Sequence, residues 1–323
     1  MATFPTFNAA TTADEVVDTF AEDIKGKNVL VTGTSVTGIG FETARAIAKY
    51  ASLVVITGLQ ASKAAILDVV PAANVRTLTL DLSSLAAVRK AAVEVNAYAE
   101  PLHVLINNAA ATSGAYSLTA DNIEIQMAAG HIGPFLFTNL LMPKILSCGS
   151  PTWTPRVVFV SSVAHQRENG VTVDDKEAFL HGQPGLTPLV RYGQVKSANV
   201  LTAKEIARRG KGRVLAYSLN PGTIWTNAFQ KGFQPELKQL GAVDEEGNPN
   251  PNLPGGKQWK TLSQGAATTL VAAFDPRLRD QPGVYLDDCV VAEESVAPHS
   301  SDMTRAEKLW ELTEDVVGEK FIW

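Results

Sequence analysis

Cysteine is scarce in this chain of 323 residues, where only Cys148 and Cys289 are present. Two lone cysteines cannot build a disulfide framework, and they favour a reducing compartment. The five histidines are scattered, and no C-x-x-C or H-x-x-x-H spacing occurs. We therefore predict a cytoplasmic protein without a metal site.

The chain also has no excess of basic over acidic residues. The chain carries 28 Lys and Arg against 33 Asp and Glu, so its formal net charge is -5, and we expect no nucleic-acid partner. No apolar run approaches the ~20 residues that span a bilayer. Residues 1–10 have neither the basic nor the apolar region of a signal peptide. With 45% hydrophobic and 19% charged residues, the composition predicts a soluble globular protein.

Short apolar runs alternate with amphipathic stretches along most of the chain. The runs are apolar almost throughout, as strands covered on both faces must be. Strands are predicted at Asn28–Thr32, Leu53–Thr57, Val75–Leu80, Val104–Ile106, Arg156–Val160 and Val214–Leu219. Helices are predicted between them at Phe41–Tyr50, Lys63–Val69, Leu85–Ala99, Ile123–Leu146 and Tyr192–Arg208. This alternation predicts an α/β fold with a doubly wound parallel sheet.

The remaining segments give the predicted organisation of the chain. Thr12 to Glu15 has the sequence of a capping box that opens a short helix, so residues 1–26 are predicted to be a helical arm. Residues 27–323 are predicted to form one domain. It includes two long excursions, about 164–189 and 224–262, which are typical of substrate loops. A helix at Ser263–Phe274, a strand at Gly283–Leu286 and a C-terminal helix at Thr304–Val317 complete it.

A glycine-rich turn follows the first predicted strand and opens the first helix of the sheet. It contains Gly33, Ser35, Gly38, Ile39 and Gly40. Such glycines let the backbone approach a pyrophosphate at a helix N-terminus, where amide groups and the helix dipole favour negative charge. A Walker A loop is excluded, because Ile39 and Gly40 stand where a Lys and a Ser or Thr are needed. A plain tight turn is the remaining alternative.

Tyr192 and Lys196 lie four residues apart on a predicted helix, so they share one face. A phenol titrates near pH ~10 and is a poor base and a weak acid at neutral pH. A neighbouring cation favours the phenolate and lowers its pKa. The pair therefore predicts a proton donor or acceptor, although this spacing also occurs on ordinary solvated helices.

Further motifs follow the later predicted strands in order. These are Asp81-Leu82, Asn107-Asn108-Ala109-Ala110, Val160-Ser161-Ser162 and Asn220-Pro221-Gly222-Thr223-Ile224-Trp225-Thr226. Together with the glycine-rich turn and the Tyr192 and Lys196 pair, they resemble the motifs of the short-chain dehydrogenases/reductases, above all the retinol-dehydrogenase-like branch. The resemblance covers roughly residues 27–289 and implies a Rossmann-type fold.

The resemblance also implies roles for these residues. Cofactor contacts are implied at Gly33, Ser35, Gly38, Ile39, Gly40, Asp81, Leu82, Asn107, Asn108, Ala109, Tyr192, Lys196, Pro221, Gly222, Ile224 and Thr226. Hydride would pass between nicotinamide C4 and a carbonyl carbon. Tyr192 would donate a proton to the developing alkoxide, and Ser162 would hydrogen-bond the same oxygen. Lys196 would bind the ribose and lower the pKa of Tyr192. Ser161 is the alternative to Ser162.

One position departs from the family pattern. Gly130 stands where the family places a catalytic Asn, which is thought to bend the helix and hold a water linked to the Lys. Glycine permits a bend and leaves room for water, but it brings no amide. Gln126 or His131 could compensate, or both could be ordinary polar residues of the helix.

The cofactor choice depends on the end of the second predicted strand. An acid there would bind the ribose 2′-OH of NAD, and a nearby Arg often accommodates the 2′-phosphate of NADP. Thr57-Gly58-Leu59-Gln60 offers neither, and Lys63 lies within reach. We therefore favour NADP(H) over NAD(H), although Lys63 could equally be a solvated helix residue.

The two excursions carry apolar residues, namely Phe179, Leu180, Trp225, Phe229 and Phe233. They either line a pocket for a lipophilic ketone, aldehyde or alcohol, or anchor their own loops. The resemblance makes a homodimer or homotetramer plausible, through the long helix before Leu146 and the helix of Tyr192. The alternatives are a non-redox protein on the same scaffold, such as a cofactor-binding sensor or a cyclisation catalyst in secondary metabolism, and an interaction module. Turnover of carbonyl compounds and binding of cofactor distinguish these functions.

Overall fold

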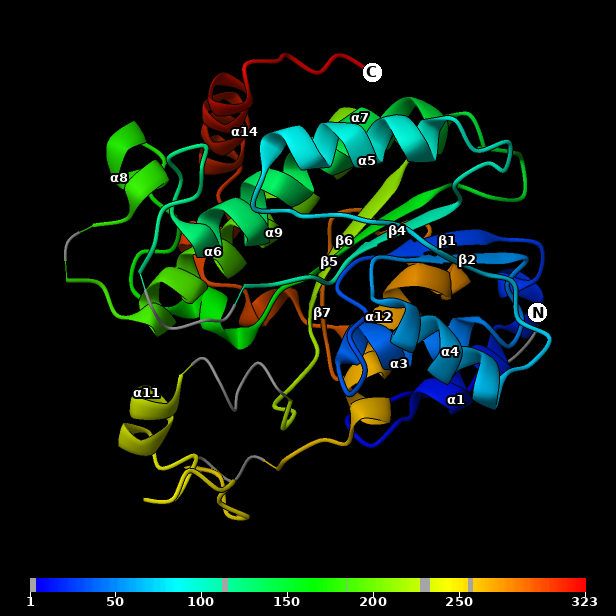
Figure 1. Ribbon diagram of the computed structural model, residues 1–323, viewed down its shortest axis with the longest axis horizontal. Coiled ribbons are helices and arrows are strands. Elements are labelled where there is room, and N and C mark those ends of the chain that lie inside the picture. The colour runs from blue at the N-terminus through cyan, green and yellow to red at the C-terminus, as the bar shows by residue number, and fades with distance from the viewer. Residues whose placement is uncertain (1–3, 112–115, 184, 227–232, 255–257) are drawn as a thin grey trace.

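A single mixed sheet runs through the middle of the computed structural model (Figure 1), which describes residues 4–111, 116–183, 185–226, 233–254 and 258–323. Its strand order is β3-β2-β1-β4-β5-β6-β7-β8. The strands are β1 (Asn28–Val31), β2 (Leu53–Ile56), β3 (Val75–Thr77), β4 (Val104–Asn107), β5 (Arg156–Val160), β6 (Leu215–Asn220), β7 (Tyr285–Asp287) and β8 (Val290–Val291). All neighbours pair in parallel except β7 and β8. The predicted doubly wound α/β sheet is confirmed.

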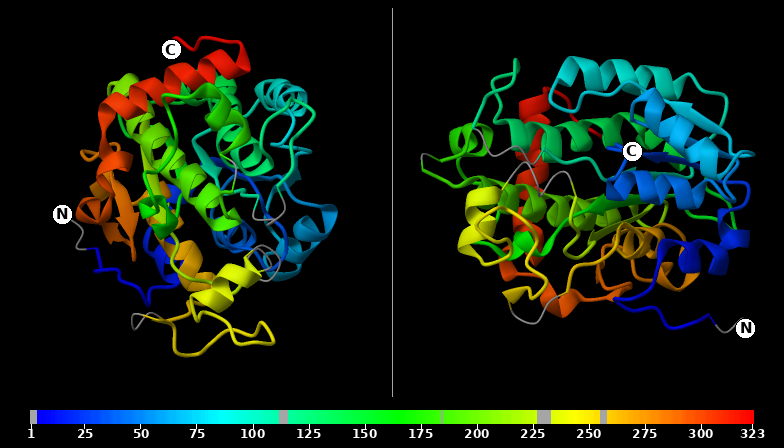
Figure 2. Two further views of the ribbon diagram at one scale, coloured as in Figure 1. Left: turned by 90° about the vertical axis from the view of Figure 1, so that its left-hand side faces the viewer. Right: turned by 60° about the horizontal axis from the view of Figure 1, so that its bottom comes forward.

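Helices cover both faces of the sheet (Figures 1 and 2). One face carries α5 (Leu85–Asn96), α7 (Gly133–Leu146), α9 (Pro188–Gly210) and α14 (Met303–Val317). The other carries α1 (Ala13–Thr19), α3 (Ile39–Ile47), α4 (Gln60–Val69) and α12 (Leu262–Phe274). In the described residues, no helix is both long and apolar enough to cross a membrane.

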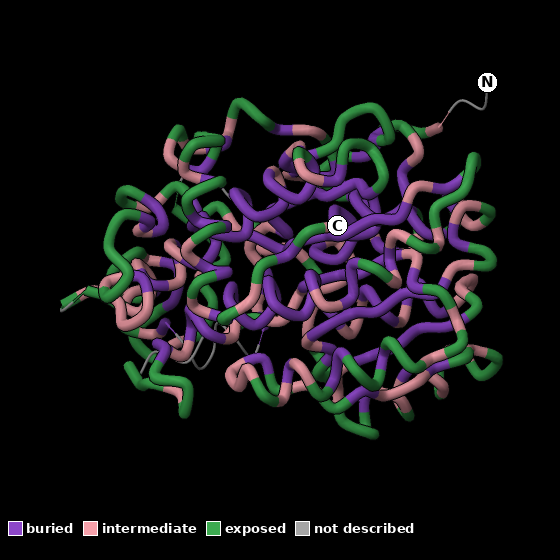
Figure 3. Tube along the Cα trace, turned by 90° about the horizontal axis from the view of Figure 1, so that it is seen from above, coloured by how far each residue is buried: buried purple, intermediate pink, exposed green. Residues whose placement is uncertain are grey.

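The core consists of two large apolar clusters, one on each face of the sheet. Alternate residues of each strand enter opposite clusters, as Leu30 and Val31 do on β1. Figure 3 shows this buried interior enclosed by exposed loops and helix faces. Every residue of β1, β2, β4, β5 and β6 is buried, which explains why these strands are apolar on both faces.

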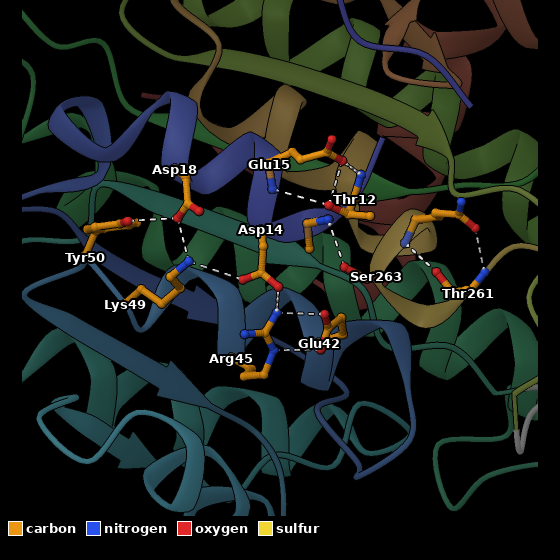
Figure 4. Close-up of polar contacts among 12 residues, drawn as sticks. Thr12, Asp14, Glu15, Asp18, Glu42, Arg45, Lys49, Tyr50, Thr261 and Ser263 are labelled. Carbon is orange, nitrogen blue, oxygen red and sulfur yellow. Dashed lines mark hydrogen bonds and ion pairs between the residues drawn. The ribbon is translucent and has the colours of Figure 1, made fainter. Parts of the chain in front are cut away.

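The N-terminal helix α1 is integrated into the second cluster through Val16, Val17 and Phe20, all of them fully buried. Its start is the predicted capping box, in which the Thr12 hydroxyl accepts from the amide of Glu15 and Glu15 Oε2 accepts from the amide of Thr12. Figure 4 shows how charged side chains tie α1 to α3. The residues joined there are Asp14, Asp18, Glu42, Arg45, Lys49 and Tyr50.

The C-terminal helix α14 packs along α9 (Figure 2), and the residues after it reach α7. The indole of Trp323 donates to Asn139 Oδ1 over 2.9 Å. The ring of Phe321 lies 5.9 Å from that of Phe135. The terminal segment thus covers part of both long helices.

Both predicted excursions contain short helices. The first includes the 3₁₀ turn η2 (Val163–Gln166) and α8 (Lys176–His181). The second includes α11 (Gln234–Gln239), which is drawn in yellow below the sheet in Figure 1. Its ends are joined, because the Lys260 amide donates to Thr223 O over 2.8 Å. The Lys260 ammonium also pairs with Asp288, which ties the end of the excursion to the turn between β7 and β8.

Several element boundaries differ from the prediction; for example, α9 begins at Pro188 rather than Tyr192, and three larger differences concern β3, β8 and the helix through Gly130. β3 ends at Thr77 rather than Leu80, and β8 was not predicted, since two residues carry no periodic pattern. The helix predicted at Ile123–Leu146 is divided into α6 (Ile125–Met127), a π-helical turn η1 (Ala128–Ile132) and α7. π-turns insert an extra residue into a helix and bend it. Gly130, which permits a bend, lies within this π-helical turn.

Gly130 also makes a close approach to α9. A Cβ atom at this position would lie 2.5 Å from Cγ1 of Val195, the residue before Lys196. No side chain fits there unless Val195 becomes smaller. Gly130 and Val195 therefore form one packing unit.

We predict that Gly130→Ala and Val195→Ala are coupled in stability. Gly130→Ala alone should destabilise the protein, because overpacking costs about 1–3 kcal/mol and outweighs the better helix propensity of Ala. Val195→Ala should relieve that overlap, giving a coupling energy of at least about 1 kcal/mol in urea unfolding of the four proteins of the cycle. Effects that add within about 0.5 kcal/mol would contradict the prediction.

Candidate active site

The glycine-rich turn lies at the carboxyl edge of the sheet, where β1 and β4 are neighbours although distant in sequence. The hydroxyl of Thr32 accepts from the amides of Asn108 and Ala109, each over 3.0 Å. The side-chain amide of Asn108 donates to Thr32 O and Gly33 O. Two motifs that are 75 residues apart in sequence thus form one contiguous wall.

Two glycines of the turn are required by this contact. Gly33 has a φ of +69°, and a Cβ there would lie 2.6 Å from Ala109 Cα. A Cβ on Gly40 would lie 2.3 Å from Asn108 Nδ2. Gly38 caps α3 without a side-chain hydrogen bond, and Ser35 is exposed on the turn. The first amides of α3 are therefore not capped by a side chain, and the backbone closes tightly around the turn, which fits the diphosphate of a dinucleotide.

The other predicted cofactor residues lie along the same edge. Asn107 ends β4, where its Nδ2 donates to Thr138 Oγ1, and its buried Oδ1 has no hydrogen-bond partner within the described part of the chain. Asp81 is exposed and Leu82 buried. The turn after β6 contains buried Pro221, Ile224 and Thr226, and Gly222 with a φ of +95°.

Ser162, Tyr192 and Lys196 come together from two elements. Ser162 follows β5, and the other two residues lie one turn apart on α9. The Ser162 hydroxyl is in hydrogen-bond contact with the phenol of Tyr192. The Lys196 ammonium lies 5.2 Å from the centre of the Tyr192 ring and donates to Val160 O over 2.7 Å. The three groups converge as the sequence predicts.

Burial dominates the electrostatics of this cluster. It raises the pKa of Tyr192 to about 12, opposed by the hydrogen bond with Ser162. It lowers the pKa of Lys196 to about 7, and no carboxylate among the described residues offsets this burial. The prediction that Lys196 lowers the pKa of Tyr192 is therefore not met in the protein alone, since the lysine's own charge is disfavoured there.

Ser161 and Ser162 have different surroundings. The Ser161 hydroxyl is buried and donates to the backbone oxygen of Lys196 over 2.8 Å. It holds α9 against the end of β5, whereas Ser162 faces Tyr192. This geometry favours Ser162 over Ser161 as the reactive hydroxyl.

The two residues that could compensate for Gly130 point elsewhere. Gln126 donates to Pro188 O over 3.3 Å. His131 lies 3.0 Å from the hydroxyl of Thr313 on α14, and burial lowers its pKa to about 3, so the ring is neutral. Both side chains make hydrogen bonds to other parts of the fold, which favours the interpretation that they are ordinary polar residues of the helix.

The apolar residues of the excursions divide between the two expected roles. The ring of Phe233 lies 5.2 Å from that of Tyr192, within a small cluster that also contains Trp225. Phe179 is buried in the main core against His131, with Leu180 beside it, so these two anchor their loop. Phe229 lies outside the described residues.

Two features of the site were not predicted from the sequence. The first is the carbonyl of Val160 as the partner of Lys196, because a backbone acceptor leaves no signal in the side chains. The second is Val195, whose branched side chain occupies the space opposite Gly130. Its position directly before Lys196 is the signal that could have indicated it.

We predict that Lys196 makes stability depend on pH. Its pKa is 10.5 when unfolded and about 7 when folded, so between these values the unfolded chain binds more protons and stability rises with pH. Lys196→Met should remove a slope of up to ~1.4 kcal/mol per pH unit from the free energy of unfolding between about pH 7 and 9.5. Lys90→Met, on the exposed face of α5, is the control. If the free energy of unfolding of Lys196→Met depended on pH as that of the wild type does, the lowered pKa of Lys196 in the folded protein would be refuted.

Comparisons with known proteins agree with this geometry. Residues 27–173 match the short chain dehydrogenase family model. The chain is 35% identical over 305 residues to the short-chain dehydrogenase/reductase prx1 of Penicillium rubens, covering 90% of this chain and 85% of that protein. It is 32% identical over 313 residues to human retinol dehydrogenase 11, covering 94% and 89%.

A crystal structure of an uncharacterised protein from Mycobacterium paratuberculosis superposes with a TM-score of 0.69 at 25% identity, covering 94% of this chain and 98% of that one. The fold, the converging residues and the relatives agree. The chain belongs to the short-chain dehydrogenase/reductase family, in its retinol-dehydrogenase-like branch.

Proposed function

We propose that this protein is an NADP(H)-preferring oxidoreductase that transfers hydride between nicotinamide and a lipophilic ketone, aldehyde or alcohol. The observation that carries the proposal is the convergence of Ser162, Tyr192 and Lys196 at the sheet edge that also bears the glycine-rich turn. Ligands of open α/β sheets bind at this edge, where the strand order reverses between β1 and β4.

Each of the three residues has a distinct part in the proposed reaction. A bound nicotinamide supplies or accepts the hydride. In the reducing direction, Tyr192 donates its proton to the substrate oxygen, and Ser162 hydrogen-bonds the same oxygen. Lys196 holds the ribose and stabilises the phenolate once it is charged. The raised pKa of Tyr192 keeps the phenol protonated and ready to donate before the substrate binds.

The preference for NADP(H) is supported by the end of β2. Thr57 accepts from the amide of Gly33, Leu59 is 80% exposed, and Gln60 donates to Thr77. None of these residues is an acid that would repel a 2′-phosphate. Lys63 is half-buried on the first turn of α4, which follows β2.

The lipophilic substrate is supported by the apolar cover of Tyr192. Leu189, Trp225 and Phe233 belong to the cluster around the phenol. A cavity of about 390 Å³ meets this cluster at Trp259, and Val163 and Gly222 also line it. Its size is in the range of small-molecule sites. Most of its lining side chains are polar, among them Asn220, Lys260 and Asp287, so the support for a lipophilic substrate comes from the cluster and not from this cavity.

The alternative is a non-redox protein on the same scaffold. It is supported by Gly130, which stands where the family has an Asn, because Val195 lies opposite Gly130 and no side-chain amide is present there.

A homodimer or homotetramer through α7 and α9 stays a prediction. The helix surface available for such an interface is reduced, because α14, Phe321 and Trp323 cover part of α7 and α9. We also propose a cytoplasmic location, in keeping with the free thiols of Cys148 and Cys289.

We predict that Tyr192→Phe removes turnover but not cofactor binding. Loss of a positioned proton donor lowers kcat by ~10²–10⁴. The phenyl ring keeps the contact with Phe233, so quenching of protein fluorescence by NADPH should give an unchanged Kd. The substrates are decanal, 2-decanone and all-trans-retinal. Undiminished kcat in Tyr192→Phe, or no turnover of any carbonyl compound by the wild type, would refute the proposed reaction.

We predict a higher kcat/KM with NADPH than with NADH. Lys63→Ala should lower kcat/KM for NADPH about five-fold, which corresponds to the ~1 kcal/mol of an exposed ion pair, and leave the value for NADH unchanged. Lys90→Ala should change neither value. A preference of the wild type for NADH would overturn the cofactor assignment.

A further inference from the structure

We propose that His165 is a positioning residue that fixes the backbone of Ser162 through its neutral, Nδ1-protonated imidazole. This inference rests on the proposed function, because Ser162 is the group that it positions. His165 lies three residues after Ser162, at the centre of the 3₁₀ turn η2, and its side chain is completely buried.

The two ring nitrogens of His165 face opposite kinds of backbone group. Nδ1 lies 2.7 Å from the carbonyl oxygen of Ser162, which can only accept. Nε2 receives the amide hydrogen of Ala297 over 3.3 Å. These two contacts are both satisfied when the proton is on Nδ1 and the lone pair is on Nε2. Burial lowers the pKa of His165, which agrees with the neutral ring.

Ser162 needs this partner because it stands where the strand ends. The ladder between β5 and β6 stops at Val160, and the amide of Ser161 makes the last bond, to Leu219 O. Beyond it, Ser162 O accepts from both the amide and the ring of His165. The Ser162 hydroxyl accepts from the amide of Ala164 over 3.2 Å. The ring bond thus holds the peptide that aims the hydroxyl at Tyr192.

The other side of His165 is joined to the C-terminal part of the chain. Its ring lies 4.9 Å from that of Tyr285 on β7. Its carbonyl oxygen is 2.8 Å from His299 Nε2 on α13 (Pro298–Ser301). The hydroxyl of Ser300 donates to that of Ser197, the residue after Lys196. His165 therefore connects the Ser162 turn to a segment that also contacts the helix of Tyr192 and Lys196.

Another histidine of the chain, His103, has the opposite tautomer. His103 Nδ1 receives the amide hydrogen of Asn28 over 3.0 Å, so its neutral ring carries the proton on Nε2. It lies at the opposite end of the sheet, before β4 begins. His103 is therefore a matched control, since it also anchors backbone but is remote from Ser162.

Two substitutions test the two hydrogen bonds of the His165 ring, to Ser162 and to Ala297, one at a time. In His165→Asn, the short amide can donate from the position of Nδ1, which retains the bond to Ser162 and loses the bond to Ala297. In His165→Gln, the longer amide reaches the position of Nε2, which retains the bond to Ala297 and loses the bond to Ser162. Both variants remove the imidazole, so general damage to packing should be similar.

The test measures kcat and KM with NADPH and decanal, 2-decanone or all-trans-retinal for both variants, His103→Gln and Tyr192→Phe. His165→Gln should lower kcat at least about ten-fold, because a displaced catalytic group loses its geometry. Its KM for NADPH should change less than about two-fold. His165→Asn should keep kcat within about three-fold of the wild type. His103→Gln should keep kcat even where it lowers the Tm.

Equal losses of kcat in His165→Asn and His165→Gln, or losses that follow the Tm, would overturn the inference, as would full kcat in His165→Gln. Its failure is distinct from failure of the proposed function. If Tyr192→Phe loses turnover and His165→Gln does not, only the inference fails. If Tyr192→Phe keeps its turnover, or the wild type reduces none of the three compounds, the proposed function fails and the inference falls with it.

Discussion

The parallel pairing of β1 with β4 is the constraint on which the rest of the site depends. It brings Leu30 beside Leu105 and places the turn after β1 against the turn after β4. Only glycine fits at Gly33 and Gly40, because Ala109 and Asn108 lie directly opposite. Since β5 and β6 follow β4 in the sheet, their carboxyl ends bring the remaining motifs to the same edge. The positions of the glycine-rich turn and of Ser162, Tyr192 and Lys196 are thus consequences of one strand order.

Burial then determines the protonation states of Tyr192 and Lys196. The phenol of Tyr192 and the ammonium of Lys196 are both biased toward their neutral forms, and Phe233 closes the apolar side of the ring. A low-dielectric site of this kind strengthens every later interaction with a charged ligand. In the proposed reaction, Tyr192 is therefore protonated before the ligands bind, and the charge that activates it has to arrive with them.

Much of this arrangement could be predicted from the sequence, for identifiable reasons. Strands buried on both faces leave unmistakable apolar runs, and β5 was located to the residue at Arg156–Val160. The motifs followed strand ends, so their common edge followed from the parallel sheet. Tertiary contacts could not be predicted: the ladder of β3 ends at Thr77, Val195 occupies the space that a side chain at position 130 would need, and the pKa of Lys196 depends on burial by distant segments. The roles of the site residues remain predictions.

The most direct test of the central claim is a crystal structure of the protein soaked with NADPH. The account predicts density for the diphosphate at the first turn of α3, and for the nicotinamide beside Ser162 and Tyr192, with the ribose on Lys196. Density for the cofactor elsewhere, or a nicotinamide remote from the phenol in fully occupied crystals, would contradict it.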